Sequence, residues 1–324
     1  MKLKIGILGT GHLGKIHIKC ILLASDHFEL TGFYDPSETA RQLVVDTHGI
    51  QAFTSAEALI QECDIIDIVS PTTTHFEMAK MVIEAGKHVF IEKPLTHTVE
   101  EAKTLIALSE KHGVKVQVGH VERFNPALLS LDNMTLNPMF IEAHRLATFN
   151  PRGTDVSVVL DLMIHDLDIL LSMVDSDIKS VAANGVCIVS PTPDIANARI
   201  EFKNGCVANL TASRISLKQM RKLRLFQSDA YISLDFLDKQ AQVVRLYDEG
   251  DANIPNIDSA MTLDTALGKK IIDISMPVIG QVNAIKMELE TFAESIVQDE
   301  TPKVSIKDGY RALELAYWIM EEID

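Results

Sequence analysis

The sequence has few cysteines, and none is placed to build a metal centre or a redox pair. The four cysteines are Cys20, Cys63, Cys187 and Cys206, which form no C-x-x-C motif and lie at no metal-ligand spacing from a histidine. We expect them to be scattered small core residues of a protein in a reducing compartment. The sequence therefore predicts no metal site and no disulfide.

Positive charge and long apolar runs are also scarce. Thirty Lys and Arg residues against 45 Asp and Glu residues give a formal net charge of −15, which opposes binding to nucleic acid or anionic lipid. The longest apolar stretch, 156–174, is interrupted by titratable residues that a membrane span tolerates poorly. The apolar run at 3–8 is too short for a signal peptide. These absences predict a cytoplasmic protein that binds neither nucleic acid nor a membrane.

The chain is long enough for two domains: it has 324 residues, 47% of them hydrophobic. Up to about residue 120, apolar runs typical of buried strands alternate with helical segments, the pattern of βαβ units on a parallel sheet. We expect strands over 3–8, 28–34, 63–71, 87–94 and 114–119, and helices over 13–23, 37–48, 55–62, 75–86 and 96–113. Ser55 is expected to cap its helix and Gly113 to end the last one.

The pattern changes after residue 121, where we place the boundary between domains 1–121 and 122–324. One helix is expected over 157–173, and β-rich runs from 178 to 246 predict an antiparallel sheet with a hairpin turn at 203–205. Residues 250–280 read as an irregular loop, and helices over 282–298 and 307–322 close the chain. We allow the last helix to pack back on the first domain.

A glycine motif follows the first expected strand and opens the first helix. The motif fits G-x-G-x-x-G and comprises Gly9, Thr10, Gly11, His12, Leu13 and Gly14. Its glycines allow a tight turn, a close backbone approach to a pyrophosphate, and packing of helix on strand, while the helix N-terminus offers N–H groups to the phosphates. The motif in this context predicts dinucleotide binding.

Asp35 follows the second expected strand, 21 residues after Gly14. A carboxylate at this position accepts hydrogen bonds from a ribose and repels a 2′-phosphate, which favours NAD over NADP. The alternative is a turn-forming aspartate before Pro36. Residues after the next two strands should also line the cofactor cleft, because ligands bind at the carboxyl ends of parallel strands: these are Ser70, Pro71, Thr72, His75, Glu92 and Lys93. The alternative for Thr72, Thr73 and His75 is a helix N-terminal cap.

Two groups could handle a proton. A lysine such as Lys93 beside a nicotinamide can hold a substrate hydroxyl and assist proton transfer. Asp161 and His165 are spaced i and i+4 on the expected helix, so the carboxylate can orient the imidazole. The alternatives are a solvated turn lysine and a structural His–Asp pair. Asp166 points away from the 161/165 face, which argues against a metal cluster on this helix.

Together these motifs resemble the glucose–fructose oxidoreductase/inositol dehydrogenase (Gfo/Idh/MocA) family over essentially the whole chain. The resemblance rests on GTGHLG at 9–14, YDP at 34–36, SPTTTH at 70–75, EKP at 92–94 and DLMIHD at 161–166. It implies a Rossmann domain followed by an α+β domain with an open-faced, mostly antiparallel sheet. It also implies a homodimer or homotetramer assembled through that sheet, with Lys93, Asp161 and His165 as catalytic residues.

The segments 118–127 and 150–170 look most like those of the UDP-N-acetylglucosamine 3-dehydrogenase branch. This resemblance implies Arg123, Asn125 and Arg152, with His165, near the sugar or its phosphates. Arg145 and Arg214 are further possible phosphate anchors, unless they form structural salt bridges.

We therefore expect an NAD-dependent oxidoreductase that transfers a hydride between a sugar carbinol and nicotinamide, with position 3 of a UDP-linked amino sugar as the reacting site. The alternatives are a dehydrogenase or reductase of a free polyol, ketosugar or other small ligand, and a non-enzymatic NAD(H) sensor. Fold analogy alone does not choose among the substrates.

Overall fold

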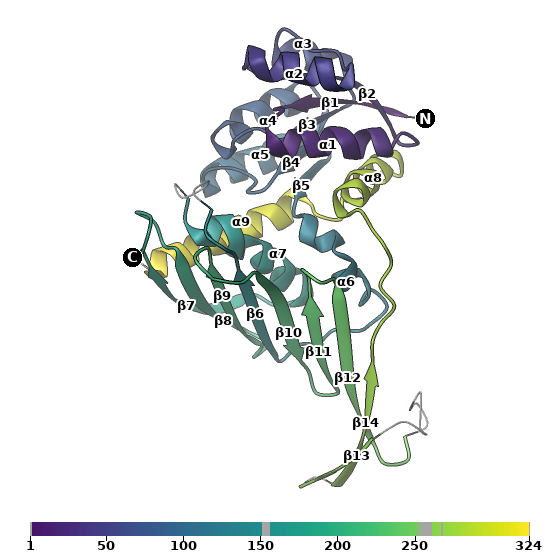
Figure 1. Ribbon diagram of the computed structural model, residues 1–324, viewed down its shortest axis with the longest axis vertical. Helices are drawn as coiled ribbons and strands as arrows, with labels where there is room; N and C mark the ends of the chain where they lie inside the picture. The colour runs from purple at the N-terminus through teal and green to yellow at the C-terminus, as the bar shows by residue number, and fades with distance from the viewer. Residues whose placement is uncertain (1, 151–155, 252–253, 255–260, 267, 324) are drawn as a thin grey trace. The chain divides into compact units, whose positions relative to one another are not determined.

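A computed structural model of the chain describes residues 2–150, 156–251, 254, 261–266 and 268–323 (Figure 1). Contacts divide the chain into two compact units. Unit 1 comprises residues 1–124 and 283–314, and unit 2 comprises residues 125–282 and 315–324. This division assigns 283–314 to unit 1, whereas the sequence analysis assigned all residues after 121 to one second domain and allowed its last helix to pack back.

Unit 1 is built on a parallel five-stranded sheet, as the sequence predicts. Its strands are β1 (Leu3–Leu8), β2 (Phe28–Tyr34), β3 (Ile65–Ile68), β4 (His88–Glu92) and β5 (Val116–Gly119). They lie in the order β2-β1-β3-β4-β5, and every pairing is parallel. All residues of β3 and β5 are buried, as expected for strands covered on both faces. The Rossmann-type first half of the fold is therefore confirmed.

Helices connect these strands at the predicted places. They are α1 (His12–Leu23), α2 (Glu38–His48), α3 (Ala56–Glu62), α4 (His75–Glu84) and α5 (Val99–His112), with a 3₁₀ turn η1 at Thr72–Thr74 and another, η2, at Val121–Phe124. The Ser55 hydroxyl accepts a hydrogen bond from the Ala58 N–H and caps α3. Gly113 ends α5 in the left-handed conformation that glycine favours. Both capping predictions are confirmed.

A distant part of the chain completes the core of unit 1. Helix α8 (Ala284–Val297) contributes Leu289 and Phe292 to the cluster that holds Ile5 of β1 and Ile18 and Ile21 of α1. Helix α9 (Ile306–Ile323) follows, and its first half belongs to this unit. Three of the four cysteines are buried, as expected, while Cys187 is exposed.

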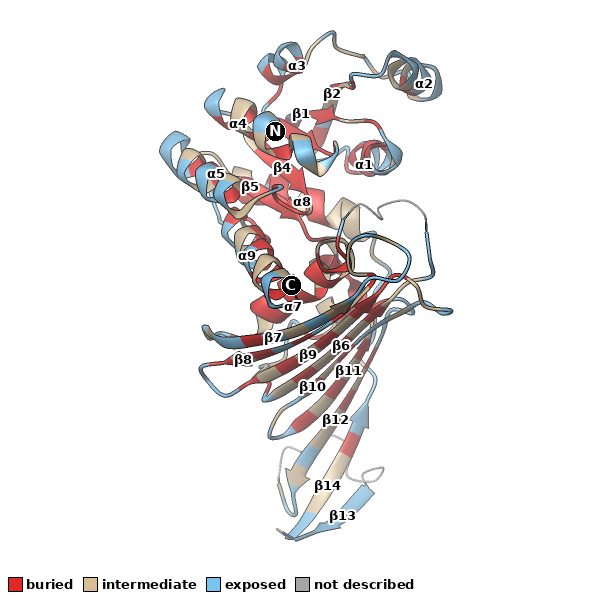
Figure 2. Ribbon diagram, turned by 90° about the vertical axis from the view of Figure 1, so that its left-hand side faces the viewer, coloured by how far each residue is buried: buried red, intermediate tan, exposed pale blue. Residues whose placement is uncertain are grey.

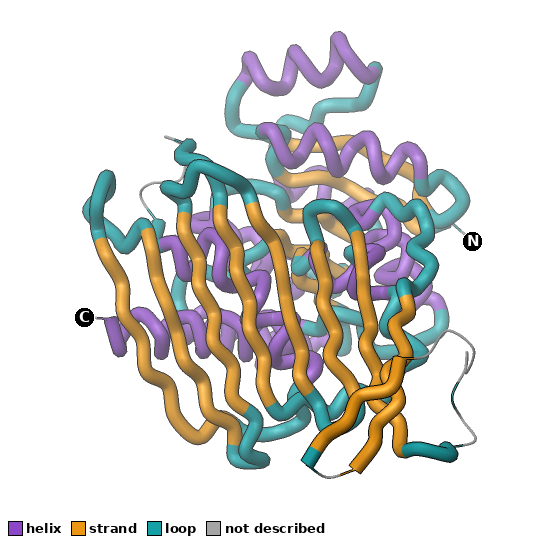
Figure 3. The backbone as a smooth tube through the Cα atoms, turned by 60° about the horizontal axis from the view of Figure 1, so that its bottom comes forward, coloured by secondary structure: helices purple, strands orange, loops and turns teal. Residues whose placement is uncertain are grey.

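Unit 2 is built on a nine-stranded sheet, seen face-on in Figure 3. Its strands are β6 (Phe140–Leu146), β7 (Ile178–Val186), β8 (Ile195–Phe202), β9 (Val207–Ser213), β10 (Met220–Phe226), β11 (Ala230–Asp235), β12 (Gln240–Asp248), β13 (Met261–Thr265) and β14 (Gly268–Ser275). They lie in the order β13-β14-β12-β11-β10-β6-β9-β8-β7. The pairings are antiparallel except that of β6 with β9. The predicted mostly antiparallel sheet and its hairpin between β8 and β9 are confirmed.

Two parts of this sheet differ from the expectation. Strand β6 was not predicted from the sequence, and it lies in the middle of the sheet. The loop expected over 250–280 is wrong in part, because β13 and β14 form a hairpin there. Most residues of these two strands are exposed or partly exposed. A strand with little buried apolar surface gives a weak periodic signal.

One face of this sheet forms the core of unit 2. Every second residue of β6 and β11 is buried, and the buried and partly exposed positions alternate along the strands in Figure 2. A π-helical turn, η3 (Val159–Met163), contacts β9 of this sheet, and the short helix α6 (Pro126–Leu129) contacts β11 and β12. The π turn continues into α7 (Ile164–Met173), so the helix predicted over 157–173 is confirmed.

None of the described helices combines the length and the apolar character needed to span a bilayer.

Candidate functional site

The glycine motif forms the loop between β1 and α1, and each glycine has its own physical reason. Gly9 has φ +98°, and a Cβ there would lie 2.9 Å from the Ser70 backbone nitrogen. A Cβ on Gly14 would lie 2.2 Å from the Gly9 carbonyl oxygen, so the helix could not pack on the loop. A Cβ on Gly11 would meet nothing within 4 Å. Gly11 thus faces open space, as a position that a pyrophosphate approaches closely must.

Helix α1 begins here without a side-chain cap, since its N-cap residue is Gly11. The N–H groups of the first helical turn have no partner within a helix, and they carry the positive end of the helix dipole. A phosphate at this point would supply the missing acceptor.

Asp35 lies directly after β2 and is held firmly toward the glycine loop. Its Oδ2 accepts hydrogen bonds from the Thr10 N–H at 2.8 Å and from the Thr10 hydroxyl at 2.9 Å. Its Oδ1 accepts the Ser37 N–H at 2.9 Å. Because a carboxylate oxygen accepts about two hydrogen bonds, Oδ1 can still accept one hydroxyl. Arg41 donates to the Asp35 carbonyl oxygen at 2.6 Å, which fixes the backbone.

A cavity of about 510 Å³ joins these features within unit 1. Its size is typical of a small-molecule or cofactor site. Nine of the predicted cofactor residues line it: Gly9, Gly11, His12, Leu13, Asp35, Ser70, Pro71, Glu92 and Lys93. Six further lining residues were not among the predicted cofactor residues: Leu8, Tyr34, Pro36, Val69, Thr74 and Met78. Several of these neighbour the predicted ones in the chain, and Thr74 and Met78 lie one helical turn apart.

Four predicted cofactor residues do not line this cavity. Thr10 and Gly14 are buried behind the loop, and Thr72 opens the turn η1. His75 is 1% exposed, with Nδ1 2.9 Å from the Pro94 carbonyl oxygen and Nε2 2.9 Å from the Ser70 carbonyl oxygen. Burial lowers the pKa of His75, an effect that the two carbonyl contacts oppose. His75 therefore ties together the loops that follow β3 and β4.

Glu92 and Lys93 stand at the end of β4. The Glu92 carboxylate accepts the Lys93 backbone N–H through Oε2 at 3.0 Å, and the Lys93–Pro94 peptide bond is cis. Gly119 of β5 leaves room for this carboxylate, because a Cβ there would lie 2.8 Å from the Glu92 Cδ. Glu92 also contacts His17 of α1, a residue that the sequence analysis did not single out.

The predicted acid–base pair lies in unit 2. Asp161 belongs to the π turn η3 and His165 to the first turn of α7. Both are partly exposed, while Met163, Ile164 and Leu167 around them are buried. Asp161 and His165 therefore share the partly exposed side of this helix and not the side that packs into the core. The π turn is a second indication, because π turns are frequent at functional sites. Lys93 belongs to unit 1.

The residues expected near the sugar or its phosphates differ in their contacts within the protein. The Arg123 Nη2 lies 3.9 Å from the Asp308 Oδ1 in unit 1. Asn125 caps α6 through its Oδ1, which accepts the Ala127 N–H at 3.1 Å, and its amide donates to the Phe236 carbonyl oxygen at 3.0 Å. Arg152 lies outside the described residues.

The structure favours the salt-bridge alternative for Arg145 over the phosphate anchor. Its side chain is 4% exposed and donates to both oxygens of Asp166, at 2.9 Å and 2.8 Å. This two-bond arrangement uses the guanidinium edge that would otherwise grip a phosphate. β6 brings Arg145 to the buried face of the sheet, which the sequence analysis could not foresee without that strand.

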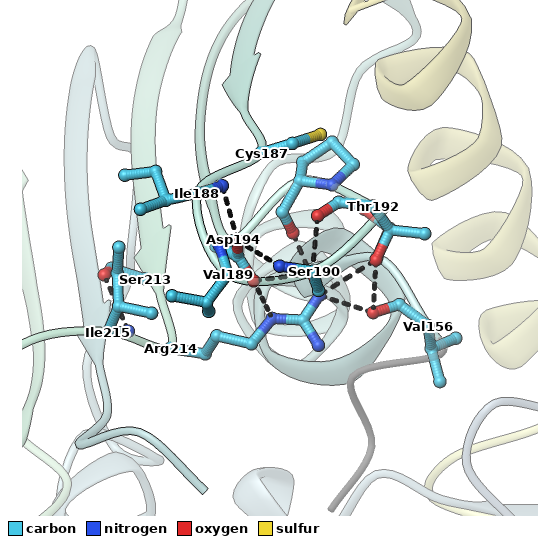
Figure 4. A network of polar contacts seen from close by, with 12 residues as sticks. Val156, Cys187, Ile188, Val189, Ser190, Thr192, Asp194, Ser213, Arg214 and Ile215 are labelled. Carbon is cyan, nitrogen blue, oxygen red and sulfur yellow. Dashed lines mark hydrogen bonds and ion pairs between the residues drawn. The ribbon is translucent and has the colours of Figure 1, made fainter. Parts of the chain in front are cut away.

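Arg214 is likewise engaged inside unit 2 (Figure 4). Its Nε lies 3.3 Å from the Asp194 Oδ1, and it donates to the carbonyl oxygens of Val156 and Pro193. Asp194 in turn accepts three successive backbone N–H groups of the loop at 188–190. The structure thus favours the salt-bridge alternative for Arg214 as it does for Arg145.

Two family models match the chain in succession. The model described as "Oxidoreductase family, NAD-binding Rossmann fold" matches residues 3–120, and "GFO/IDH/MocA C-terminal domain" matches residues 139–233.

Several proteins of known name are similar to the chain along most of its length. UDP-N-acetylglucosamine 3-dehydrogenase of Acidithiobacillus ferrooxidans is 35% identical over 91% of this chain and 88% of its own. A solved structure of that enzyme has a TM-score of 0.87 and 31% identity, covering 100% of this chain and 98% of its own. An inositol 2-dehydrogenase/D-chiro-inositol 3-dehydrogenase of Halalkalibacterium halodurans is 28% identical over 96% of this chain and 88% of its own.

Proposed function

Because this chain belongs to the Gfo/Idh/MocA family of oxidoreductases, we propose that it is an NAD-dependent dehydrogenase that oxidises position 3 of a UDP-linked amino sugar. Its class is an oxidoreductase acting on CH–OH groups, like its named relatives. The observation that carries the proposal is the cavity that joins the glycine loop, Asp35 and Lys93 in unit 1.

The residues of the cavity fit a nicotinamide dinucleotide. The open space at Gly11 and the uncapped start of α1 suit a pyrophosphate, and the remaining acceptor capacity of the Asp35 Oδ1 suits a ribose hydroxyl. The fixed negative charge of Asp35 opposes a 2′-phosphate, so NAD is the proposed cofactor. When bound, NAD supplies a hydride acceptor for the sugar carbinol.

The chain's own residues would orient the substrate and move its proton. The Lys93 ammonium would donate to the reacting hydroxyl oxygen and stabilise the negative charge that develops on it. His165 would accept the hydroxyl proton, and Asp161 would orient the imidazole and stabilise its protonated form. Arg123, Asn125 and Arg152 remain the proposed contacts of the sugar and its phosphates.

The similarity to UDP-N-acetylglucosamine 3-dehydrogenase supports a nucleotide sugar as substrate. A second class of relative favours another candidate. The similarity to the inositol dehydrogenase extends over 96% of this chain. A free polyol is therefore the alternative substrate.

The two candidates are separated by following NADH absorbance with wild-type protein, NAD and a panel of UDP sugars, inositols and free hexoses. The proposal predicts reduction of NAD with UDP-N-acetylglucosamine and little with inositol. Turnover of inositol alone would mean that the substrate is a free polyol and not a nucleotide sugar. Absence of turnover with every carbinol tested would contradict the assignment as a dehydrogenase.

The open face of the unit 2 sheet is the proposed surface of a homodimer or homotetramer. An aromatic cluster lies on three of its neighbouring strands: ring centroids are 5.9 Å apart between Phe140 and Phe226 and 5.0 Å apart between Phe226 and Tyr231. Partly exposed rings in contact are typical of an interface core. Light scattering of wild-type protein and of Phe226→Glu tests this: the substitution should yield monomers, and an unchanged mass would place any interface elsewhere.

A further inference from the structure

His17 is a buried histidine of unit 1 with a carboxylate on each ring nitrogen. It lies in α1 and is 0% exposed. Its Nδ1 is 2.9 Å from the Asp67 Oδ2 of β3, and its Nε2 is 3.1 Å from the Glu92 Oε1 of β4. The Phe90 ring packs edge-on against the imidazole, with ring centroids 5.7 Å apart. The side chain is therefore fixed by contacts from two strands.

A carboxylate accepts hydrogen bonds, and a neutral imidazole has a single N–H donor. The Nδ1 contact with Asp67 is a hydrogen bond, and the Nε2 contact with Glu92 is an ion pair when the ring carries two protons and a positive charge. Burial lowers the pKa of His17, but the Asp67 and Glu92 carboxylates outweigh it and raise the pKa well above 6.5. The same contacts lower the pKa of Glu92 against the effect of its own burial. The two flanking carboxylates and the raised pKa of His17 both favour the imidazolium form.

The Glu92 carboxylate connects His17 to the backbone at the end of β4. Its Oε1 faces His17, while its Oε2 accepts the backbone N–H of Lys93, which lines the cavity. Gly119 provides the space for this carboxylate, because a Cβ there would lie 2.8 Å from the Glu92 Cδ. Each oxygen of the Glu92 carboxylate therefore has a contact that favours this orientation, one with His17 and one with the Lys93 backbone.

Resting on the proposed function, we propose that His17 is a positioning residue for Lys93, acting through the Glu92 carboxylate. His17 does not itself line the cavity; it contacts the Glu92 carboxylate, which lines the cavity and accepts the Lys93 backbone N–H. The charged and titratable groups that face this network are Asp67 from β3, Glu92 and Lys93 from the end of β4, His75 from α4, and Cys20 from α1 itself.

Two substitutions of His17 each keep one of its two contacts and remove the other. An asparagine amide reaches about as far as Nδ1, so His17→Asn keeps a donor for Asp67 and loses the donor to Glu92. A glutamine amide reaches about as far as Nε2, so His17→Gln keeps a donor for Glu92. His88→Gln is the matched control, because His88 begins β4 at the end away from Lys93.

The first readout does not need a substrate. We expect hydrogen exchange at the Lys93 amide to be at least about tenfold faster in His17→Asn than in wild type, and little changed in His17→Gln and His88→Gln. Equal exchange in His17→Asn and wild type would overturn the proposal whatever the enzyme oxidises. If His17→Asn does not fold, Glu92→Gln provides the same test of the Lys93 amide, since it weakens both bonds of the carboxylate.

The second readout is turnover with the sugar that the wild-type enzyme oxidises. Misplacing a catalytic group by about 1 Å can cost about 100-fold, so we expect kcat of His17→Asn to fall about 10- to 100-fold with KM for NAD within about threefold. Both His17 variants should move the acid limb of the pH profile upward, because the loss of the imidazolium charge raises the pKa of Glu92. Normal kcat per folded molecule with an unmoved limb would reduce His17 to a stabilising role. Inactive wild type would contradict the proposed function alone.

Discussion

The two units bury carboxylates in different relations to a cavity. In unit 1, Asp35 and Glu92 are nearly buried and also line the 510 Å³ cavity. In unit 2, Asp166 and Asp194 are each ion-paired to a buried arginine. A buried ion pair by itself is weak evidence for function or for net stability. The connection of a buried charge to a ligand-sized cavity therefore decides its role: substitution of these buried charges and their ion-pair partners should affect catalysis in unit 1 and folding in unit 2.

The largest effect on catalysis is expected at Lys93. Lys93→Met removes the charge at the cavity and should lower kcat by about 1,000-fold, within the range for loss of a group that handles the reacting proton. NADH affinity, measured by fluorescence titration, should stay within a few-fold of wild type. If Lys93→Met retained more than a tenth of the wild-type kcat, Lys93 would not be a catalytic residue and the cavity would not be the site of the reaction.

His165 tests whether unit 2 also supplies a reacting group. His165→Ala should reduce turnover by at least about 100-fold, the usual scale for an acid–base residue. Thermal unfolding should change little, because His165 is only partly buried. Full activity would remove His165 from the mechanism and leave the chemistry to unit 1.

Arg145 should show the opposite behaviour. Arg145→Met leaves Asp166 buried without its bidentate partner and should lower the free energy of unfolding by about 3 kcal/mol. Arg199→Met is the control, since the Arg199–Glu201 pair is exposed and should cost less than about 1 kcal/mol. Urea unfolding measures both. Unchanged stability with lost sugar affinity in Arg145→Met would restore Arg145 as a substrate contact.

Asp35 should control the choice of cofactor. Asp35→Asn keeps an oxygen for the Thr10 N–H and removes the charge that opposes a 2′-phosphate. The ratio of kcat/KM for NAD over NADP should fall by about tenfold, a change of about 1.4 kcal/mol. Asp46→Asn, an exposed position on α2, should leave the ratio unchanged. An unaltered ratio in Asp35→Asn would transfer cofactor selection to other residues.

The smallest expected effect is a pH dependence of stability at His17. Its pKa is raised in the folded protein, so its contribution to stability is complete below the unfolded-state value and is lost as the pH rises through the folded-state value. The difference in unfolding free energy between wild type and His17→Gln should therefore be larger near about pH 6 than near about pH 9. A difference that grows with pH would mean that His17 is not the charged member of the network.

The sequence was informative where backbone geometry dictates residue type. Gly9 and Gly14 are required by a positive φ and a 2.2 Å approach, and these constraints leave a readable motif. Contacts between side chains of different strands leave no such pattern. The His17–Asp67–Glu92 network joins residues up to 75 positions apart, and Arg145 could be assigned to a salt bridge only once β6 was known.

The most direct test of the account is calorimetric titration of the purified chain with NAD and with NADP. The account predicts saturable one-site binding of NAD, weaker binding of NADP, and loss of NAD binding when Gly11 is replaced by Trp, whose side chain would fill the open side of the loop. Wild-type protein that binds neither dinucleotide would contradict the assignment of the cavity and with it the proposed reaction.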